Sequence, residues 1–501
     1  MNSKVYLIGA GPGNAGLITV RGLELVRKAD VLIYDQLGTS EFLKEAPKNC
    51  QMFDVGKSAG NHKLSQDGIN ELLYQKAKEF TTVVRLKGGD PYIFGRGGEE
   101  FLYLQERGIN VEVVPGVTSA ISAASYAGIP ITHRGYTTSM AIVTGHEAEK
   151  ETSDINWNAL AGIGTVVFLM GVKNISQICQ SLIASGKSPD TPVAMVRYGT
   201  QSRQESYFGK LSTMSEIVIQ KNIQAPCVTI VGNVVDLHNK LNWFEKLPLF
   251  GKRIVVTRSR AQSSNLLATL KELGADAIEC PTIKISEIEN NQALQDFINN
   301  NNTYTHLIFT SVNGVNTFIE KLLAQGKDLR ILYGKKLVCI GPATAEAFKQ
   351  KGIIADYIPE TYVAEAMIPW FEKQPKGKIA ILRAEKAREV LPEALSKLGH
   401  NVDVIPLYHT EFESEINSEV TEYLKNSQID YVTFTSSSTV EGFAKLLEGS
   451  DIKPDKIPAA VIGPVTAETC KKYGFPVKIA AEEYTIPGLV QMIIRHASKT
   501  L

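Results

Sequence analysis

A long internal repeat in the second half of the chain limits the folds that this sequence can adopt. Phe309–Val315 (FTSVNGV) returns 125 residues later as Phe434–Val440 (FTSSSTV). Ile340–Gly352 (IGPATAEAFKQKG) returns 122 residues later as Ile462–Gly474 (IGPVTAETCKKYG). Solenoid repeats have much shorter periods, of about 20 to 50 residues. The repeat therefore predicts two similar lobes rather than an array of small stacked units.

Each lobe alternates short apolar runs with helical patterns. Six runs have the length and composition of buried strands: Ile254–Thr257, His306–Phe309, Val338–Ile340, Ile379–Leu382, Tyr431–Phe434 and Ala460–Ile462. Alternation of this kind is typical of parallel sheets that carry helices on both faces. We therefore expect an α/β fold.

The first half of the chain shows similar strands but much longer glycine-rich loops. Its expected strands are Val5–Ile8, Val31–Tyr34, Thr82–Leu86, Val166–Met170 and Val228–Val231. The segment Leu237–Lys252 separates the two kinds of sequence. We expect one domain over residues 1–245, a linker over 246–251 and a second domain over 252–501.

Composition excludes several classes of protein. The 501 residues include 53 basic and 53 acidic side chains, so the net charge is zero. Nucleic-acid binding proteins need clustered positive charge, so no such partner is expected. The chain has no apolar run of membrane-spanning length and does not begin like a signal peptide, so no membrane association is expected. Its 6 cysteines form no C-x-x-C pair, which favours isolated core thiols in the cytoplasm and no metal site.

Two glycine-rich segments in the first half carry most of the chemical signal. Gly9–Gly13 (GAGPG) lies where a strand turns into a helix, but it lacks the G-x-G-x-x-G spacing of dinucleotide sites and also fits a simple tight turn. Val84–Glu100 (VRLKGGDPYIFGRGGEE) is more specific, because it embeds charges among glycines directly after a strand. Ligands of open α/β sheets bind at this edge, where Asp90 can accept hydrogen bonds.

These segments resemble the tetrapyrrole methylases, and in particular uroporphyrinogen-III C-methyltransferase. The motifs GAGPG, YDQL (34–37), VGK (55–57), RLKGGDPYIFGRGGEE, PGVTSA (115–120), GIPITHRG (128–135) and TGH (144–146) occur in the family's order. The resemblance implies a two-lobed fold that binds S-adenosylmethionine between the lobes. The family's cofactor contacts fall on Pro12, Gly88, Gly89, Asp90, Ile93, Thr118, Ser119, Met170, Gly199 and Cys227.

The same resemblance assigns catalytic and substrate residues. The family's proposed acid and base residues match Asp35 and Lys57, and His133 and Arg134 are expected to hold acidic groups of the macrocycle. A carboxylate is suited to removing the proton that the ring must lose after methyl transfer. Without the family match, Asp35 would equally fit a turn acid and Lys57 a solvated surface lysine.

The second half resembles uroporphyrinogen-III synthase in VTRSR (256–260), the two repeated motif pairs and PLYHT (406–410). The resemblance implies two lobes, one over 252–283 and 410–501 and the other over 284–409, with parallel sheets. Tyr408 matches the tyrosine proposed to assist departure of the substrate hydroxyl. Ser and Thr residues at expected helix starts suit an anion site, and arginines suit carboxylates. The expected substrate residues here are Arg258, Ser311, Thr344, Arg383, Ser436, Ser437 and Thr466.

Together, the two resemblances imply a bifunctional enzyme of tetrapyrrole synthesis. One half would cyclise hydroxymethylbilane to uroporphyrinogen III with inversion of ring D. The other would methylate that product twice, to precorrin-2, with S-adenosylmethionine and with neither a metal nor NAD. A homodimer through the methylase half is expected from the family alone. Two alternatives stay open: a second half that only binds acidic ligands, and a methylase that acts on a later corrinoid.

Overall fold

The computed structural model describes residues 3–35, 38–56, 64–145 and 154–499. The chain forms two compact units. The first contains Met1–Lys252 and Leu273–Asp276, and the second contains Arg253–Glu272 and Ala277–Leu501. Each unit holds two five-stranded sheets. Among the helices of the described ranges, none combines the length and apolar character that a membrane span needs.

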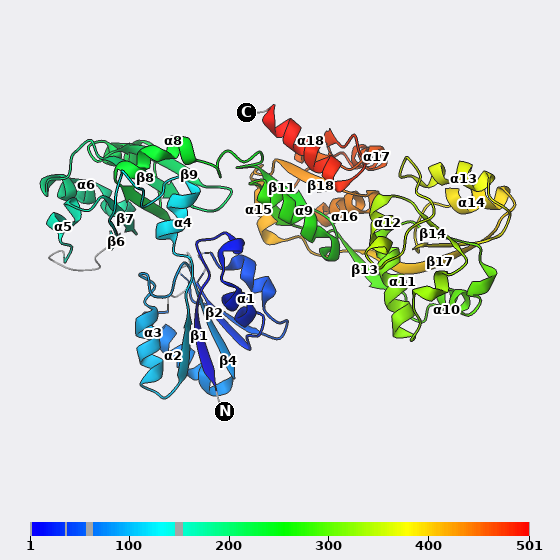
Figure 1. Ribbon diagram of the computed structural model, residues 1–501, viewed down its shortest axis with the longest axis horizontal. Coiled ribbons are helices and arrows are strands. Elements are labelled where there is room, and N and C mark those ends of the chain that lie inside the picture. Colours follow the sequence, from blue (N-terminus) through cyan, green and yellow to red (C-terminus); the bar gives the residue numbers. More distant parts are fainter. Residues whose placement is uncertain (1–2, 36–37, 57–63, 146–153, 500–501) are drawn as a thin grey trace. The chain divides into compact units, whose positions relative to one another are not determined.

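The first sheet of unit 1 is parallel throughout and has the strand order β3-β2-β4-β1-β5. Its strands are β1 (Lys4–Gly9), β2 (Val31–Tyr34), β3 (Gln51–Asp54), β4 (Thr82–Lys87) and β5 (Asn110–Val114). Helix α1 (Val20–Val26) lies on one face, and helices α2 (Gln66–Glu79) and α3 (Gly97–Gln105) lie on the other (Figure 1). Because helices cover both faces of the sheet, the strand residues that point to either face are buried in an apolar core.

The second sheet of unit 1 is mixed, with the order β6-β7-β10-β8-β9. Only β6 and β7 pair in parallel, whereas β10 runs antiparallel to both β7 and β8. Its strands are β6 (Met140–Thr144), β7 (Thr165–Leu169), β8 (Pro192–Arg197), β9 (Glu205–Lys210) and β10 (Cys227–Val231). The helices of this region are α4 (Ser119–Tyr126), α5 (Trp157–Ala161), α6 (Ile175–Ala184), α7 (Met214–Gln220) and α8 (His238–Leu241).

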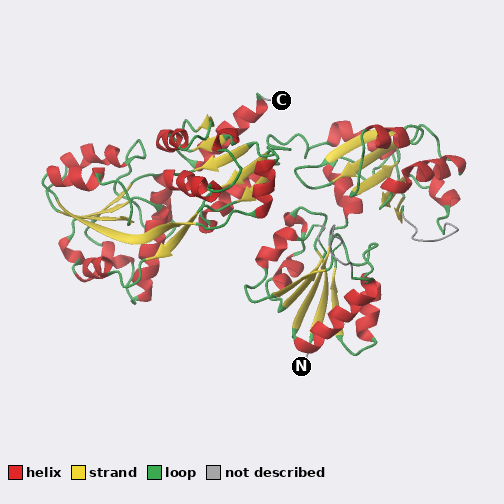
Figure 2. Ribbon diagram, turned by 180° about the vertical axis from the view of Figure 1, so that it is seen from behind, coloured by secondary structure: helices red, strands yellow, loops and turns green. Residues whose placement is uncertain are grey.

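Unit 2 contains two sheets whose strands alternate with helices, as the repeat predicts (Figure 2). The first has the order β12-β11-β18-β19-β20: β11 (Arg253–Val256), β12 (Asp276–Glu279), β18 (Tyr431–Phe434), β19 (Ala459–Val461) and β20 (Val477–Ala480). The second has the order β13-β17-β16-β14-β15: β13 (Ile283–Glu287), β14 (His306–Phe309), β15 (Lys336–Cys339), β16 (Lys378–Ala384) and β17 (Asn401–Phe412). The helices are α9 (Arg260–Glu272), α10 (Gln292–Asn299), α11 (Val312–Ala324), α12 (Pro342–Lys349), α13 (Ile368–Glu372), α14 (Val390–Lys397), α15 (Ser418–Lys425), α16 (Ser437–Leu447), α17 (Pro464–Lys472) and α18 (Ile486–Ser498).

The chain passes between the two lobes of unit 2 along β13 and β17. These strands pair antiparallel from Ile283 opposite Phe412 to Glu287 opposite Tyr408. Beside the crossing, the buried Thr282 hydroxyl donates to the carbonyls of Thr257 and Thr439. The antiparallel pair is the exception in a unit whose other recorded strand pairs are parallel.

Candidate functional site

Four glycines bring the loops at the carboxyl edge of the first sheet into backbone contact. Gly11 and Gly89 exchange two backbone hydrogen bonds, at 3.2 and 2.8 Å. A Cβ on Gly116 would lie 2.2 Å from the Gly89 carbonyl oxygen, and a Cβ on Gly9 would lie 2.5 Å from the Gly116 Cα. Real side chains cannot occupy such space, so the loops after β1, β4 and β5 meet only because these positions are glycine.

Asp90 joins two of these loops through its carboxylate. Its Oδ1 accepts from the Tyr92 backbone N–H at 2.8 Å, and its Oδ2 accepts from the Gly116 N–H at 2.9 Å. Thr118 follows as the N-cap of α4, where its hydroxyl accepts from the Ala120 N–H at 3.3 Å. Asp90 therefore fixes the loop that contains Gly88 and Gly89, and Thr118 fixes the first turn of α4, where Ser119 lies. Pro12 lies in the separate loop after β1, between Gly11 and Gly13.

Ile93 lies exposed in the loop after β4. The other three predicted cofactor residues, Met170, Gly199 and Cys227, gather at one edge of the second sheet. Antiparallel pairing places the start of β10, at Cys227, opposite the end of β8, and the next residue of β10 opposite the end of β7. Met170 follows β7 directly, and Gly199 lies in the loop after β8. A Cβ on Gly199 would meet the Cβ of Ala123 at 2.5 Å, so glycine is required for α4 to pack here. Burial raises the pKa of the Cys227 thiol to about 12, which makes it a packing residue rather than a nucleophile.

The two edges are linked within unit 1. The Asn14 backbone N–H, just after the glycine turn, donates to the Thr200 hydroxyl at 3.2 Å. A cleft of about 690 Å³ is lined by Tyr92, Phe94, Arg96, Gly97, Gly98, Glu99 and Met170. This volume is within the usual range for a small-molecule site.

Backbone strain concentrates around the same loops. Among the described residues, five non-glycine residues near the cleft have left-handed backbone angles: Phe94, Arg96, Met170, Tyr198 and Thr200. Such angles cost free energy and persist where the surrounding structure imposes them, which is common at ligand sites. Arg96 also pairs with Glu99 through two nitrogens, at 2.8 and 2.6 Å, and the hydrogen bond raises the pKa of Arg96.

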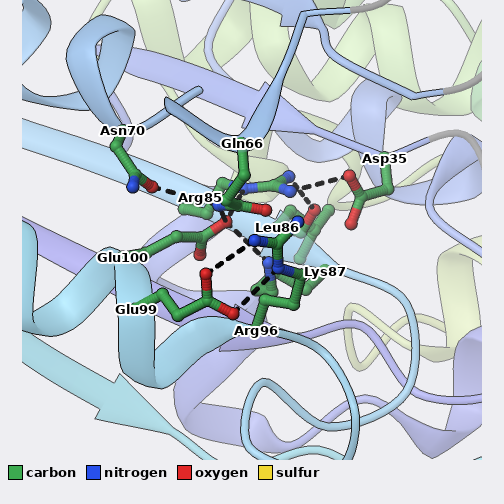
Figure 3. Close-up of polar contacts among 9 residues, drawn as sticks. All are labelled: Asp35, Gln66, Asn70, Arg85, Leu86, Lys87, Arg96, Glu99 and Glu100. Atoms are coloured by element: carbon green, nitrogen blue, oxygen red, sulfur yellow. Dashed lines mark hydrogen bonds and ion pairs between the residues drawn. The ribbon is translucent and has the colours of Figure 1, made fainter. Parts of the chain in front are cut away.

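A cluster of four charged side chains lies beside the cleft loops (Figure 3). Arg85 Nη2 contacts Asp35 Oδ1 at 2.7 Å, and Arg85 Nε contacts Glu100 Oε1 at 3.2 Å. Lys87 Nζ reaches the same Glu100 oxygen at 2.7 Å. Desolvation and the neighbouring guanidinium of Arg85 lower the pKa of Lys87, and the Glu100 carboxylate partly opposes this.

In unit 2, the predicted catalytic tyrosine contacts a predicted substrate residue. Tyr408, near the end of β17, is buried, and its hydroxyl lies 2.9 Å from the Ser311 hydroxyl. Ser311 is the N-cap of α11 and accepts from the Gly314 N–H at 3.0 Å. Burial raises the pKa of Tyr408, so its hydroxyl carries a proton at neutral pH.

Of the other residues expected to cap helices, Ser436 is confirmed, whereas Ser437, Thr344 and Thr466 do not hold the cap position. Ser436 caps α16 in a capping box with Thr439, and Ser437 is the first helical residue, 2.8 Å from the Thr469 hydroxyl. Thr344 and Thr466 are not N-caps, so that expectation is wrong. Gly341 and Gly463 hold the cap positions of α12 and α17, with proline next, and the two threonines are buried.

The predicted arginines of unit 2 are largely buried. Burial lowers the pKa of Arg258, which lies between β11 and α9. Arg383 donates to the Arg388 carbonyl at 2.8 Å and pairs with Glu389, so in this structure it holds its own loop. In unit 1, His133 and Arg134 are exposed in the turn that precedes β6. Lys57 and the His146 of the TGH motif lie outside the described residues.

Comparisons with known proteins agree with this division into two units. Residues 4–215 match the family of tetrapyrrole (corrin/porphyrin) methylases, and residues 264–491 match uroporphyrinogen-III synthase HemD. A porphyrin biosynthesis protein HemD of Ruminiclostridium josui is 38% identical over 98% of this chain and 97% of its own length. The chain belongs to this family of fused methylase–synthase proteins.

Two further relatives match the methylase unit. An S-adenosyl-L-methionine-dependent uroporphyrinogen III methyltransferase of Methanosarcina barkeri is 48% identical over 48% of this chain and 94% of its own length. The solved uroporphyrin-III C-methyl transferase of Thermus thermophilus, complexed with S-adenyl homocysteine, is 36% identical over 47% of this chain and 100% of its own, with a TM-score of 0.42.

Reasoning from sequence missed several residues of both units. In the methylase unit, the glycine-rich segment 84–100 predicted a ligand loop but not the ion pairs of its charged residues, which are Arg85, Lys87, Arg96, Glu99 and Glu100. The sequence signal that could have found this cluster is the pair of charged residues Arg85 and Lys87 at alternate positions of a central strand. In the synthase unit, the sequence did not predict the contacts of Tyr362 and Tyr484 with the glycine caps. A Cβ on Gly341 would lie 3.3 Å from the Tyr362 ring, and a Cβ on Gly463 would lie 3.2 Å from the Tyr484 ring. These tyrosines are 122 residues apart, the spacing of the Ile-Gly-Pro repeat.

Proposed function

We propose that this chain catalyses two consecutive reactions, cyclisation of hydroxymethylbilane to uroporphyrinogen III and methylation of that product to precorrin-2. The observation that supports the methylation half is the backbone contact among the loops after β1, β4 and β5; the loop after β4, together with Met170, lines the cleft. Its lining combines glycine backbone, exposed aromatic and thioether side chains and a fixed Arg96–Glu99 pair. The Methanosarcina barkeri relative, which is named for the same methylation, matches this unit over 94% of its own length.

The loops after β1, β4 and β5 fit S-adenosylmethionine, because they meet through backbone atoms. Because Gly9, Gly89 and Gly116 have no side chains, the loops present backbone atoms where they meet. When bound there, the cofactor supplies an electrophilic methyl group to a nucleophilic carbon of the substrate. The chain's own part is to hold the two reactants in line, which needs rigid loops of the kind that Asp90 secures.

Asp35 is the residue we assign to the proton that follows methyl transfer. The methylated ring carries positive charge until a C–H bond breaks and its electron pair returns to the ring. The Asp35 carboxylate accepts that proton as an O–H bond, a role worth typically ~10²–10⁴ in rate. Lys57 is proposed to supply a proton or to hold a substrate carboxylate, and His133 and Arg134 are proposed to hold acidic side chains of the macrocycle.

For the synthase unit, we propose that the protein acts mainly by folding the linear substrate so that its ends meet. Tyr408 donates its proton to the departing hydroxyl, a role that its raised pKa permits, because the group stays protonated at neutral pH. Ser311, Ser436, Ser437 and Arg258 are proposed to bind substrate carboxylates. The alternative, a module that only binds acidic ligands, is not favoured by a relative that matches both units along 97% of its length.

One assay tests both halves. The purified chain is given hydroxymethylbilane with S-adenosylmethionine, and the products are separated by ring isomer and by methyl count. Precorrin-2 with the inverted ring is expected. The non-inverted isomer, which forms spontaneously, would refute the synthase assignment, and unmethylated uroporphyrinogen III would refute the methylase assignment.

The proposal also covers domain limits, assembly and requirements. We propose one domain over residues 1–245, a linker over 246–251 and a second domain over 252–501; the end of the main part of the first compact unit at Lys252 supports these limits. We propose a homodimer through the methylase unit in the cytoplasm, tested by light scattering and fractionation. Neither reaction is proposed to need metal or NAD. Dialysis against a chelator, with no nucleotide added, should leave both rates unchanged.

A further inference from the structure

The charged cluster of the methylase unit contains three side chains that the proposed chemistry does not use. The side chains of Arg85, Lys87 and Glu100 are 2%, 4% and 0% exposed, whereas that of Asp35 is 31% exposed. Burying three charged groups is costly, and such groups are retained where they serve binding, catalysis or specificity more often than stability. The cluster reaches the solvent-accessible edge of the sheet only through Asp35.

The fold brings these residues together by strand order. Arg85 and Lys87 are two residues apart on β4, so both side chains lie on the face that α2 and α3 cover. Asp35 is the first residue after β2, the neighbour of β4, and its N–H donates to the Leu86 carbonyl at 3.2 Å. Glu100 enters from the first turns of α3. Figure 3 shows Arg85 between the two carboxylates.

The cluster is a continuous row of contacts, because Glu100 Oε1 contacts both Lys87 Nζ and Arg85 Nε. Lys87 and Glu100 balance each other at 2.7 Å in the buried part of the cluster. Gln66, from α2, adds a hydrogen bond to the same Glu100 oxygen at 3.3 Å. The guanidinium of Arg85 is therefore the charge that is left to face Asp35. Removing Arg85 leaves a balanced buried pair, whereas removing Glu100 would leave two buried cations.

The contact between Arg85 and Asp35 involves one carboxylate oxygen. Arg85 Nη2 donates to Oδ1 at 2.7 Å, and the guanidinium is itself fixed by Glu100 and by the Leu86 carbonyl at 3.3 Å. Asp35 Oδ2 accepts no hydrogen bond from any residue in the described ranges. A charge-assisted bond of this length holds a carboxylate in one orientation.

We propose that Arg85 is a positioning residue for methylation: it fixes Asp35 through Oδ1 and leaves Oδ2 to take the proton from the methylated ring. This proposal rests on the function assigned above to Asp35. The Lys87–Glu100 pair keeps Arg85 in place without competing for Asp35. Arginine suits this role because its planar fork bonds two carboxylates at once, which a lysine ammonium cannot do with the same geometry.

The test compares Arg85→Gln, Arg85→Lys, Asp35→Asn and the double variant Arg85→Gln/Asp35→Asn in the full chain. Arg27→Gln is the matched control, because Arg27 also pairs with a glutamate, Glu45, but on the exposed surface of the same lobe. Methylation of uroporphyrinogen III is measured at saturating cofactor, together with binding of S-adenosylhomocysteine and the cyclisation rate of the same sample. The last two readouts report on folding of the two units.

Arg85→Gln is expected to lower kcat for methylation by ~10–100-fold, part of the ~10²–10⁴ that a positioned base supplies. Binding of S-adenosylhomocysteine and cyclisation should stay within about twofold, Arg85→Lys should recover part of kcat, and Arg27→Gln should have no effect. In the double variant, the loss should equal that of Asp35→Asn alone, because Arg85 acts only through Asp35.

Two results would overturn the positioning role alone: unchanged kcat in Arg85→Gln, or losses that multiply in the double variant. If Asp35→Asn keeps full activity, the base assignment itself is wrong and the positioning role falls with it. If Arg85→Gln fails to bind S-adenosylhomocysteine, Arg85→Lys decides. Full activity with the lysine point charge then means that orientation by the fork is not needed, and the proposal is overturned.

Discussion

Asp90→Ala should separate the two activities of the chain. The substitution removes two hydrogen bonds, from the Tyr92 N–H at 2.8 Å and the Gly116 N–H at 2.9 Å. A hydrogen bond to a charged group contributes about 1.5–3 kcal/mol, and the lower end applies to this partly exposed carboxylate. The loss of both bonds therefore removes about 3 kcal/mol that stabilises the loop after β4 and its contact with the loop after β5.

If the loops must be ordered for the cofactor to bind, that energy appears as lost affinity. At about 1.4 kcal/mol per tenfold, the Kd for S-adenosylhomocysteine should rise by ~100-fold. Asp90→Asn is the matched variant, because its amide oxygen can still accept one of the two bonds, and a rise of about tenfold is expected from the bond it loses.

The assay is isothermal titration of the purified full chain with S-adenosylhomocysteine, with the cyclisation rate measured on the same sample. Cyclisation should be unchanged, because both hydrogen bonds of Asp90 are made to residues of unit 1. An unchanged Kd in Asp90→Ala would refute the reasoning that the loops are preorganised through this carboxylate. Loss of both activities would show instead that the units depend on each other for folding.

Three other predictions concern packing, the synthase tyrosine and the thiols. Gly116→Ala should lower the Tm of the methylase unit by ~5–10 °C, because its Cβ would lie 2.2 Å from a carbonyl oxygen. Gly162→Ala, whose Cβ would meet its nearest neighbour at 3.6 Å, should melt like the parent, and equal melting of both variants would contradict the close approach. Tyr408→Phe should lower cyclisation at least ~10-fold while methylation of supplied uroporphyrinogen III continues, and unchanged cyclisation would remove Tyr408 from the mechanism. Native alkylation at pH 8, read by mass spectrometry, should label the partly exposed Cys50 first, because burial raises the pKa of Cys227 and Cys339 to about 12 and keeps them protonated. Early labelling of Cys227 would contradict the packing described for β10.

Local patterns in the sequence determined the elements and many of their ends. Apolar runs of three to five residues formed the expected strands, and the repeat correctly indicated two similar lobes in the second half. Ser311 and Ser436 cap their helices because a hydroxyl two or three positions before the free N–H groups is a local arrangement. Thr344 and Thr466 failed as caps for an equally local reason, since the preceding Gly-Pro starts the helix earlier.

The contacts that build the sites were decided only by the tertiary structure. Arg85 and Asp35 are 50 residues apart, and they meet because β4 lies between β2 and β1 in the sheet. Tyr408 and Ser311 are 97 residues apart and meet because β17 passes the start of α11. Periodicity reports which face of an element is apolar, but it carries no information on strand order. Strand order depends on how whole faces pack, and so it sets which loops become neighbours.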